Sequence, residues 1–401
     1  MPSKEVKSMK IAIVGGGAAG FFLAVNLKEM MPDAAVTIFE RSSRVLAKVE
    51  VSGGGRCNCT NTFEDIRDLS AVYPRGHRLM KRLFNVFSYH DAYQWFERHG
   101  VPLTVQPDHC VFPAAQDSHA VIDCFMSLAR RYHIEIRTHV KIQSLEPLSD
   151  YDYVAITTGG SPKGEGLQWL QALGHEIETP VPSLFSFSVN DLSLTALQGL
   201  VVSSVTAHIP GTKLRASGPL LITHWGVSGP AVLKLSSYAA RHLADTDYRA
   251  PLRIDWLSMP ETEVQNVLLE TMIQQPQKML TTFNPFGLQQ RLWLLLLEKA
   301  LASRSQIRWN ELNKKDVNRL VNVFTNDVYQ IAGRAPFRDE FVTCGGIALS
   351  SVQPATLESR HVPNLYFAGE VLDIDGITGG FNFQAAWTTA YTVAQSICKR
   401  G

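Results

Sequence analysis

The chain has 401 residues, of which 45% are hydrophobic and 19% charged, so it can form a sizeable core and is not intrinsically disordered. Its 38 basic and 37 acidic residues leave a formal net charge of +1, and binding to nucleic acid or an anionic membrane would need a local patch. The longest unbroken apolar run, Leu292 to Leu297, is far shorter than the roughly 20 residues that span a bilayer. We expect a small-molecule substrate, no nucleic-acid partner and no membrane partner, and leave the oligomeric state open.

Six cysteines in a chain of this length are typical of a reducing compartment, so we expect a cytoplasmic protein. Cys57 and Cys59 have one residue between them and no second pair exists, which disfavours a structural metal site. The basic and apolar N-terminus imitates a signal peptide, but the glycines from Gly15 to Gly17 interrupt it, and we interpret it as a mature N-terminus.

The first predicted elements form a β-α-β unit. Residues Lys10 to Val14 are almost entirely apolar, as in a strand covered on both faces. A helix from Phe21 to Met31 follows and ends before Pro32, and Ala35 to Phe39 is predicted to be the second strand. Further helices are expected near 75–86, 90–99 and 118–132, an extended ribbon at 101–113, and strands at 134–140 and 153–157.

The composition changes after about residue 180, where prolines and a Ser/Phe-rich segment indicate a boundary. Residues 186–260 alternate short β-type runs with turns, and helical patterns follow at 261–274, 285–301 and 315–331. Strand patterns return at 341–349 and 364–367, and a helix is expected at 382–399. The chain therefore begins and ends with α/β segments, which predicts a doubly wound domain interrupted by an insert.

The segment from Gly15 to Gly20 matches G-x-G-x-x-G between a predicted strand and a predicted helix. Gly15 allows the tight turn, Gly17 lets backbone approach a pyrophosphate, and Gly20 allows the helix to pack closely on the strand. Glu40 ends the second strand, where a carboxylate accepts hydrogen bonds from an adenosine ribose and would repel a 2′-phosphate. This pattern predicts a site for FAD or NAD rather than NADP, the alternative being a turn that serves packing only.

Two later segments bear on the choice of cofactor. Residues 51–61 form a second loop with three consecutive glycines, whose N–H groups can surround an anion or lie against a flat ring. Residues 365–384 carry Ala-Gly-Glu after an apolar strand, then a turn-rich loop and a helix whose N-terminus favours negative charge. These two segments favour a flavin cofactor over a nicotinamide cofactor alone. Residues 51–61 are also compatible with a flexible surface loop.

Together, V-G-G-G-A-A-G, S-G-G-G-R-C-N and Y-F-A-G-E-V-L-D-I-D-G-I-T-G-G-F-N resemble the HI0933-like family of bacterial NAD(P)/FAD-dependent oxidoreductases. The resemblance covers essentially the whole chain and implies an α/β fold. In it, a Rossmann-like FAD-binding domain is built from both chain ends, with an inserted β-barrel-like and helical domain. The expected boundaries are 1–185 and 336–401 for the two parts of the FAD-binding domain, 186–260 for the β-rich insert and 261–335 for the helical insert. It also implies non-covalent FAD, while described members include bile-acid reductases and aminoacetone oxidases.

The resemblance assigns cofactor contacts residue by residue. The expected set is Gly15, Gly17, Ala19, Gly20, Glu40 and Arg41 for the ADP half; Arg56, Cys57 and Asn58 in the loop near the flavin; Gly369 and Asp375 near the ribityl phosphate; Gly380, Phe381 and Asn382 at the isoalloxazine; and Val140, whose backbone would hold adenine. The sequence departs from the family at Cys344, where a glycine is usual, and at Cys59, where an aliphatic residue is usual.

The sequence identifies no acid or base with certainty, since flavin N5 itself exchanges the hydride. His224 and Asp375 are the candidate catalytic residues, with a turn-fixing histidine and a turn-capping aspartate as the alternatives. Three readings stay open. The protein is an FAD-dependent oxidoreductase that transfers hydride between NAD(P)H and a small organic substrate, a flavin oxidase that uses O2, or a non-catalytic FAD-binding or RNA-modification accessory protein. The short basic segment from Arg334 to Arg338 does not argue for RNA.

Overall fold

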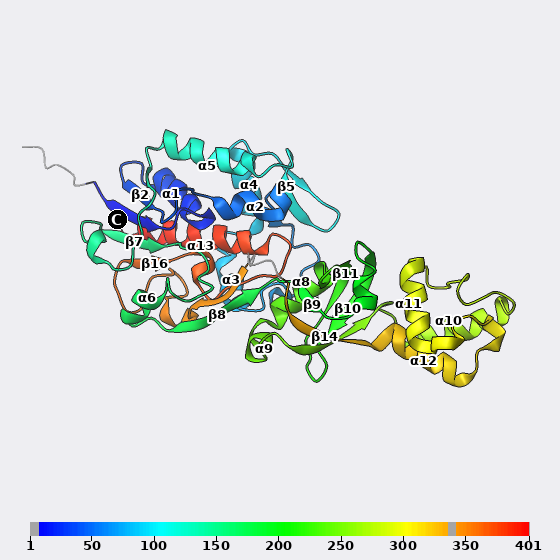
Figure 1. Ribbon diagram of the computed structural model, residues 1–401. Helices are drawn as coiled ribbons and strands as arrows, with labels where there is room; N and C mark the ends of the chain where they lie inside the picture. Colours follow the sequence, from blue (N-terminus) through cyan, green and yellow to red (C-terminus); the bar gives the residue numbers. More distant parts are fainter. Residues whose placement is uncertain (1–7, 336–341, 401) are drawn as a thin grey trace, which may run out of the picture. The chain divides into compact units, whose positions relative to one another are not determined.

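A computed structural model describes residues 8–335 and 342–400. The described chain forms two compact units, residues 8–181 with 342–400 and residues 182–335. The first unit is therefore built from both ends of the chain, and the second is a continuous insert. Figure 1 shows both, with the N-terminal segments in blue and the C-terminal helix in red.

A five-stranded parallel sheet forms the centre of the first unit, in the order β16-β7-β1-β2-β6. Its strands are β1 (Lys10–Val14), β2 (Ala35–Phe39), β6 (Glu135–Arg137), β7 (Tyr153–Ile156) and β16 (Leu365–Phe367). Four of these five strands end in runs of buried residues, as expected when helices cover both faces. The last strand of the chain thus pairs within the N-terminal sheet, which confirms a Rossmann-like domain made from both ends.

Several helices of the first unit contribute rings to an aromatic core. They are α1 (Ala18–Met30), α2 (Ala47–Gly55), α3 (His77–Leu83), α4 (Tyr89–Arg98), α5 (His119–Arg131), α6 (Gln168–Ala172) and α13 (Phe381–Cys398). The ring of Phe22 on α1 lies 4.6 Å from Trp95 on α4 and 5.1 Å from Trp387 on α13, measured between ring centroids. These buried contacts hold α1 beside α13, as Figure 1 shows.

Two small sheets complete this unit. Strands β3 (Thr60–Asn61), β5 (Cys110–Pro113) and β4 (Leu103–Val105) form a three-stranded sheet in that order, and β4 and β5 correspond to the ribbon expected at 101–113. Strands β15 (Val342–Ile347) and β8 (Ile177–Ser183) form a two-stranded sheet. Within α2, residues Ser52 to Gly54 depart from helical backbone angles, so the helix gives way to the glycine loop there.

The insert contains a closed six-stranded barrel in the order β10-β11-β12-β9-β14-β13. The strands are β9 (Phe187–Val189), β10 (Val201–His208), β11 (Arg215–Thr223), β12 (Gly226–Ser228), β13 (Ala250–Asp255) and β14 (Asp327–Arg334). The helices are α7 (Leu192–Thr195), α8 (Pro230–Tyr238), α9 (Ala240–Asp245), α10 (Glu261–Gln274), α11 (Gln290–Leu301) and α12 (Lys314–Asn326). Barrel and helices share one apolar core, in which Trp293 lies 5.3 Å from Phe324 between ring centroids. The expected barrel-like and helical insert is confirmed.

Two local expectations for the insert are wrong. The helix predicted through residue 331 ends at Asn326, and β14 begins at the next residue. Asp327, Tyr329 and Ile331 are buried while their neighbours Val328 and Gln330 are exposed, so the period is that of a strand. Helices α8 and α9 also interrupt the segment that was expected to contain strands and turns only, and α8 starts at a proline, which is favourable in the first turn.

Candidate dinucleotide-binding site

The turn between β1 and α1 needs glycine at two positions because protein backbone occupies the space of a side chain. A Cβ on Gly15 would lie 2.4 Å from the carbonyl oxygen of Thr157, and the φ of Gly15 is +118°. A Cβ on Gly20 would lie 2.1 Å from the carbonyl oxygen of Gly15. These contacts fix the strand-to-helix turn and the close packing of α1 on β1, as the motif predicts.

Gly17 is different because nothing lies within 4 Å of where its Cβ would be. It is the N-cap residue of α1, and no side chain caps the helix there. The first turn also has no acidic residue that would compete with an anion. The open space therefore faces uncapped N–H groups at the positive end of the helix dipole, which suits a pyrophosphate.

Glu40 organises the adjacent edge of the sheet. Its carboxylate accepts hydrogen bonds from the Gly16 N–H at 2.9 Å and from the Ser42 N–H at 2.8 Å. The Val140 N–H donates to the Glu40 carbonyl oxygen at 2.9 Å, so only the carbonyl of Val140 is available for an adenine contact. Val140 follows β6 rather than lying in it, and Arg41 is exposed. All three assignments stay predictions.

The second glycine loop is joined to the start of α13. In the amide orientation that satisfies its neighbours, Asn58 accepts from the Gly380 N–H at 3.1 Å and donates to the Thr60 carbonyl oxygen at 2.9 Å. The Thr60 hydroxyl donates to the amide oxygen of Gln384 at 2.6 Å. A Cβ on Gly380 would lie 2.2 Å from the Thr60 carbonyl oxygen. The loop and the helix N-terminus therefore form one rigid wall.

The two ends of the chain meet at Ala19 and Gly369. A Cβ on Gly369 would lie 2.8 Å from the Cβ of Ala19, and the φ of Gly369 is +77°. The Gly369 N–H donates to the Thr389 hydroxyl at 2.9 Å, which ties the turn after β16 to α13. The first and third motifs, about 350 residues apart, thus share one surface at the carboxyl ends of β1 and β16, where dinucleotides bind in open α/β sheets.

Three polar residues that the sequence did not identify converge beside this surface. The Glu370 carboxylate accepts from the Thr343 N–H at 2.9 Å and pairs with Lys48 at 2.8 Å. Among residues 8–335 and 342–400, the buried Thr343 hydroxyl has no hydrogen-bond partner, as expected where a ligand supplies the missing group. Glu370 directly follows Ala368 and Gly369 in the third motif, so its position in the sequence could have identified it as a site residue. No motif surrounds Lys48, and the sequence gives no indication that it belongs to the site.

Asp375 is fully buried and forms a bidentate ion pair with Arg75. Its proximity raises the pKa of Arg75, although burial alone would lower it. Cys344 and Asp373 lie close to Asp375, and each has an interaction partner of its own. Because the Asp375 carboxylate is already engaged by a guanidinium, the geometry favours a structural role in this loop, and proton donation by Asp375 stays a prediction.

The remaining expected contacts fall into two groups. Asn382 and Phe381 hold the loop in front of α13. The Asn382 amide bonds the Gly376 N–H and carbonyl at 2.8 and 2.9 Å, and the Phe381 carbonyl accepts from the Tyr73 hydroxyl. Cys57 is buried with its Sγ 3.8 Å from that of Cys59, and Arg56 is exposed with its guanidinium over the Phe112 ring. None of these placements tests a flavin contact.

His224 lies in the insert, at the exposed turn between β11 and β12, with its ring 4.3 Å from that of Trp225. No hydrogen bond of its side chain occurs within the described part of the chain. The geometry of this turn gives no support for proton donation, and the assignment stays a prediction.

The HI0933-like protein Rossmann domain matches residues 9–396. The chain belongs to this family. Curated relatives of similar length include the 3-dehydro-bile acid delta(4,6)-reductase of Clostridium scindens, 27% identical over 98% of this chain and 99% of that protein. They also include the ribosomal RNA dihydrouridine synthase of Escherichia coli, 27% identical over 96% of this chain and 97% of that protein. The second name conflicts with the expectation, drawn from the charge balance, that the protein has no nucleic-acid partner.

Among solved structures, the 3-ketosteroid delta1-dehydrogenase of Sterolibacterium denitrificans has a TM-score of 0.53 and 11% identity, covering 98% of this chain and all of that one. This likeness concerns the fold. The family makes the chain a flavoprotein oxidoreductase with an FAD-binding Rossmann-type domain. The uncapped α1 N-terminus, the open space at Gly17 and the unpartnered Thr343 hydroxyl fit that cofactor. Within the described ranges, no helix is long and apolar enough to cross a membrane.

Proposed function

We propose that the protein is an FAD-dependent reductase that takes hydride from NAD(P)H and transfers it to a C=C bond conjugated with a carbonyl group in a small organic molecule. The observation that carries the proposal is the shared surface of Gly17, Ala19 and Gly369, where both ends of the chain meet around uncapped helical N–H groups. The names of the two kinds of relatives support the bond type. A delta(4,6) bond beside a 3-dehydro group and the C=C bond of uridine are both conjugated with a carbonyl.

Bound FAD would supply the hydride from its reduced isoalloxazine. The chain would hold the pyrophosphate at the α1 N-terminus and direct the Glu40 carboxylate toward the adenosine ribose, as the sequence predicts. Asn58 would keep Gly380 in place as the wall beside the flavin. Arg75 would neutralise Asp375 and keep the loop after β16 ordered.

The donor and the acceptor are tested separately. Purified protein should be yellow, and NADH or NADPH should bleach it in the absence of O2. Addition of cyclohexenone should then restore the oxidised spectrum and yield the saturated ketone. Bleaching by an amine, followed by rapid reoxidation in air but not by the enone, would instead identify an oxidase. A colourless protein that takes up no added FAD would overturn the reductase proposal and exclude the oxidase as well.

A uridine in RNA is the second candidate substrate. Two curated relatives carry that activity in their names, the second being from Haemophilus influenzae, 26% identical over 97% of this chain. Within the described part of this chain, Arg215, Lys234 and Arg253 line two adjoining cavities on the barrel without an ion-pair partner, which favours it. Reduced protein offered uridine-containing RNA should produce dihydrouridine, detectable by mass spectrometry of the nucleosides. The small number of cysteines predicts a cytoplasmic location, where both candidate substrates would be reduced.

A further inference from the structure

Three basic side chains lie in one row across the outer face of the barrel. His208 on β10 is directly opposite Arg215 on β11 and Arg253 on β13. Along these strands the neighbouring residues Ala207, Ala216 and Ile254 are buried, so the row points away from the core. The His208 ring bonds the Thr212 carbonyl oxygen at 2.9 Å and lies between the two arginines, so the row holds two guanidinium groups on the outer face of the barrel.

Two adjoining cavities of about 400 and 250 Å³ open over this row, and Thr206 and Arg215 line both. Lys234, on α8, adds a further cation to the larger cavity, and Arg253 belongs to the smaller one. Within the described chain, the side chains of Arg215, Lys234 and Arg253 have no ion-pair or hydrogen-bond partner. The Nε of Arg253 is buried as well as unpartnered, which is an unfavourable arrangement without a ligand.

The acidic groups nearby do not neutralise this groove. Asp255 lines the smaller cavity, and its carboxylate accepts from the Leu257 and Ser258 N–H groups rather than from an arginine. Glu261 accepts from the Asn326 amide at the margin. Three formal cations therefore face one carboxylate. The hydroxyls of Thr206 and Ser217, 2.8 Å apart in the next row, add donors for phosphate oxygens.

We propose that this groove, lined by Arg215, Lys234 and Arg253, binds successive phosphates of a single-stranded RNA segment. The inference deepens the second candidate substrate and rests on it. The cations extend over three neighbouring strands, about 10 Å at ordinary strand spacing, which suits a polyanion better than a single phosphate. Tyr238 also lines the larger cavity.

The test measures binding of a fluorescent uridine-rich 12-mer RNA to the FAD-containing protein by anisotropy over a range of salt concentrations. The triple variant Arg215→Gln, Lys234→Gln, Arg253→Gln should bind at least about tenfold more weakly. Its salt slope should fall by about two, since each phosphate contact on a single strand contributes about 0.7. Arg215→Gln alone should weaken RNA binding by a smaller factor. Because Arg215 is exposed, this single variant should fold normally, and it keeps the test valid if the triple variant misfolds.

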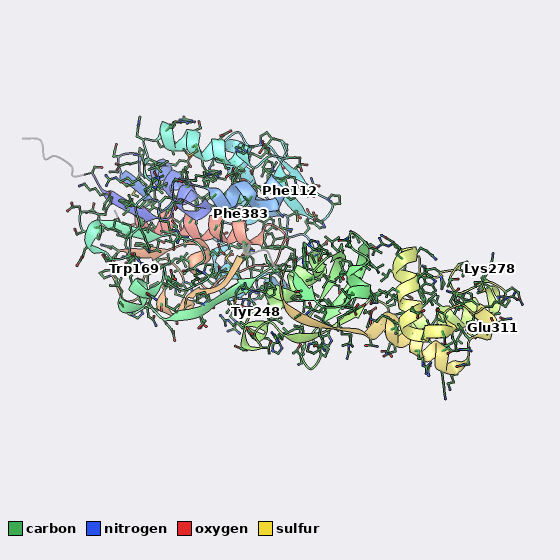
Figure 2. All side chains as sticks on the ribbon, viewed as in Figure 1. Phe112, Trp169, Tyr248, Lys278, Glu311 and Phe383 are labelled. Carbon is green, nitrogen blue, oxygen red and sulfur yellow. The ribbon has the colours of Figure 1, made fainter. Side chains whose placement is uncertain are left out.

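The control variant carries Lys278→Gln, Lys314→Gln and Lys315→Gln. It removes the same number of positive charges as the groove variant, but from the helical part of the insert. Figure 2 labels Lys278 there. It should bind RNA like the parent protein.

Equal losses of RNA affinity in the two triple variants, no binding of RNA by the parent protein, or displacement of RNA by millimolar inorganic phosphate or NADPH would overturn the proposal. Bleaching by NADPH, measured in the same samples, should be unchanged in the groove variants. A failure of flavin reduction would therefore count against the proposed function and not against the groove.

Discussion

The first unit places glycines where its site lies, and the insert fills its interior with large rings. Gly15 and Gly20 leave no room for even a methyl group, and Gly17 borders open space. In the insert, Trp293 is fully buried and packs against Trp309 and Phe324. The contrast indicates that the residues of the glycine turn are set by backbone geometry, although the first unit has an aromatic core of its own. The core residues of the insert are set by the volume they fill.

The strongest expected effect separates two glycines of one motif. Gly20→Ala would put a Cβ 2.1 Å from a backbone oxygen, so α1 cannot pack on β1, and we expect loss of the folded first unit and of bound FAD. Gly17→Ala should leave the fold intact, because its backbone is extended and its Cβ meets no protein atom. It should nevertheless weaken FAD binding at least about tenfold. Circular dichroism and FAD titration would check both, and equal behaviour of the two variants would contradict this reading.

Removal of a large ring should affect the insert instead. Trp293→Ala deletes a buried indole that stacks on Phe324 and donates to the Leu280 carbonyl, and such changes cost about 3–5 kcal/mol. Chemical unfolding followed by tryptophan fluorescence should show the loss, while FAD content per folded molecule stays unchanged. If FAD were lost in proportion, the two units would not be independently stabilised.

The buried ion pair of the first unit should matter more than an exposed one. Arg75→Met leaves the carboxylate of Asp375 without its bidentate partner, and we expect destabilisation by about 3 kcal/mol. Arg44→Met, which breaks an exposed pair with Glu50, should cost less than about 1 kcal/mol. Urea titration of both variants measures the difference, and similar midpoints would show that Asp375 does not need the guanidinium.

The smallest effect is a pH dependence in the first unit. Burial raises the pKa of Glu29, but the hydrogen bond and charge of His99, with the Tyr132 hydroxyl, bring it below the ordinary 4.5. The stabilisation is therefore present above pH 4.5 and is lost as the pH falls through the lowered value. Glu29→Gln should lower the melting temperature near neutral pH and remove part of its fall on acidification. A parallel fall in both proteins would contradict the assignment.

The sequence predicts most elements of the first unit because their signals are local. Apolar runs give β1 and β2, and the glycine spacing gives the turn before α1. The end of α12 was missed because five residues of β14 also fit a helical pattern until the barrel pairs them with β13 and β9. Secondary structure is therefore least predictable where a strand is stabilised by partners distant in the sequence.

Residue types and spacing by themselves determined the dinucleotide turn, the glycine loop and the return of the chain to its first sheet. Only the tertiary structure decided that Ala19 meets Gly369, that Arg75 pairs with Asp375, and that Arg215 lies in register with His208 and Arg253. The reason is physical. A turn or helix start depends on neighbouring residues, whereas a contact across 300 residues or three strands depends on register and packing.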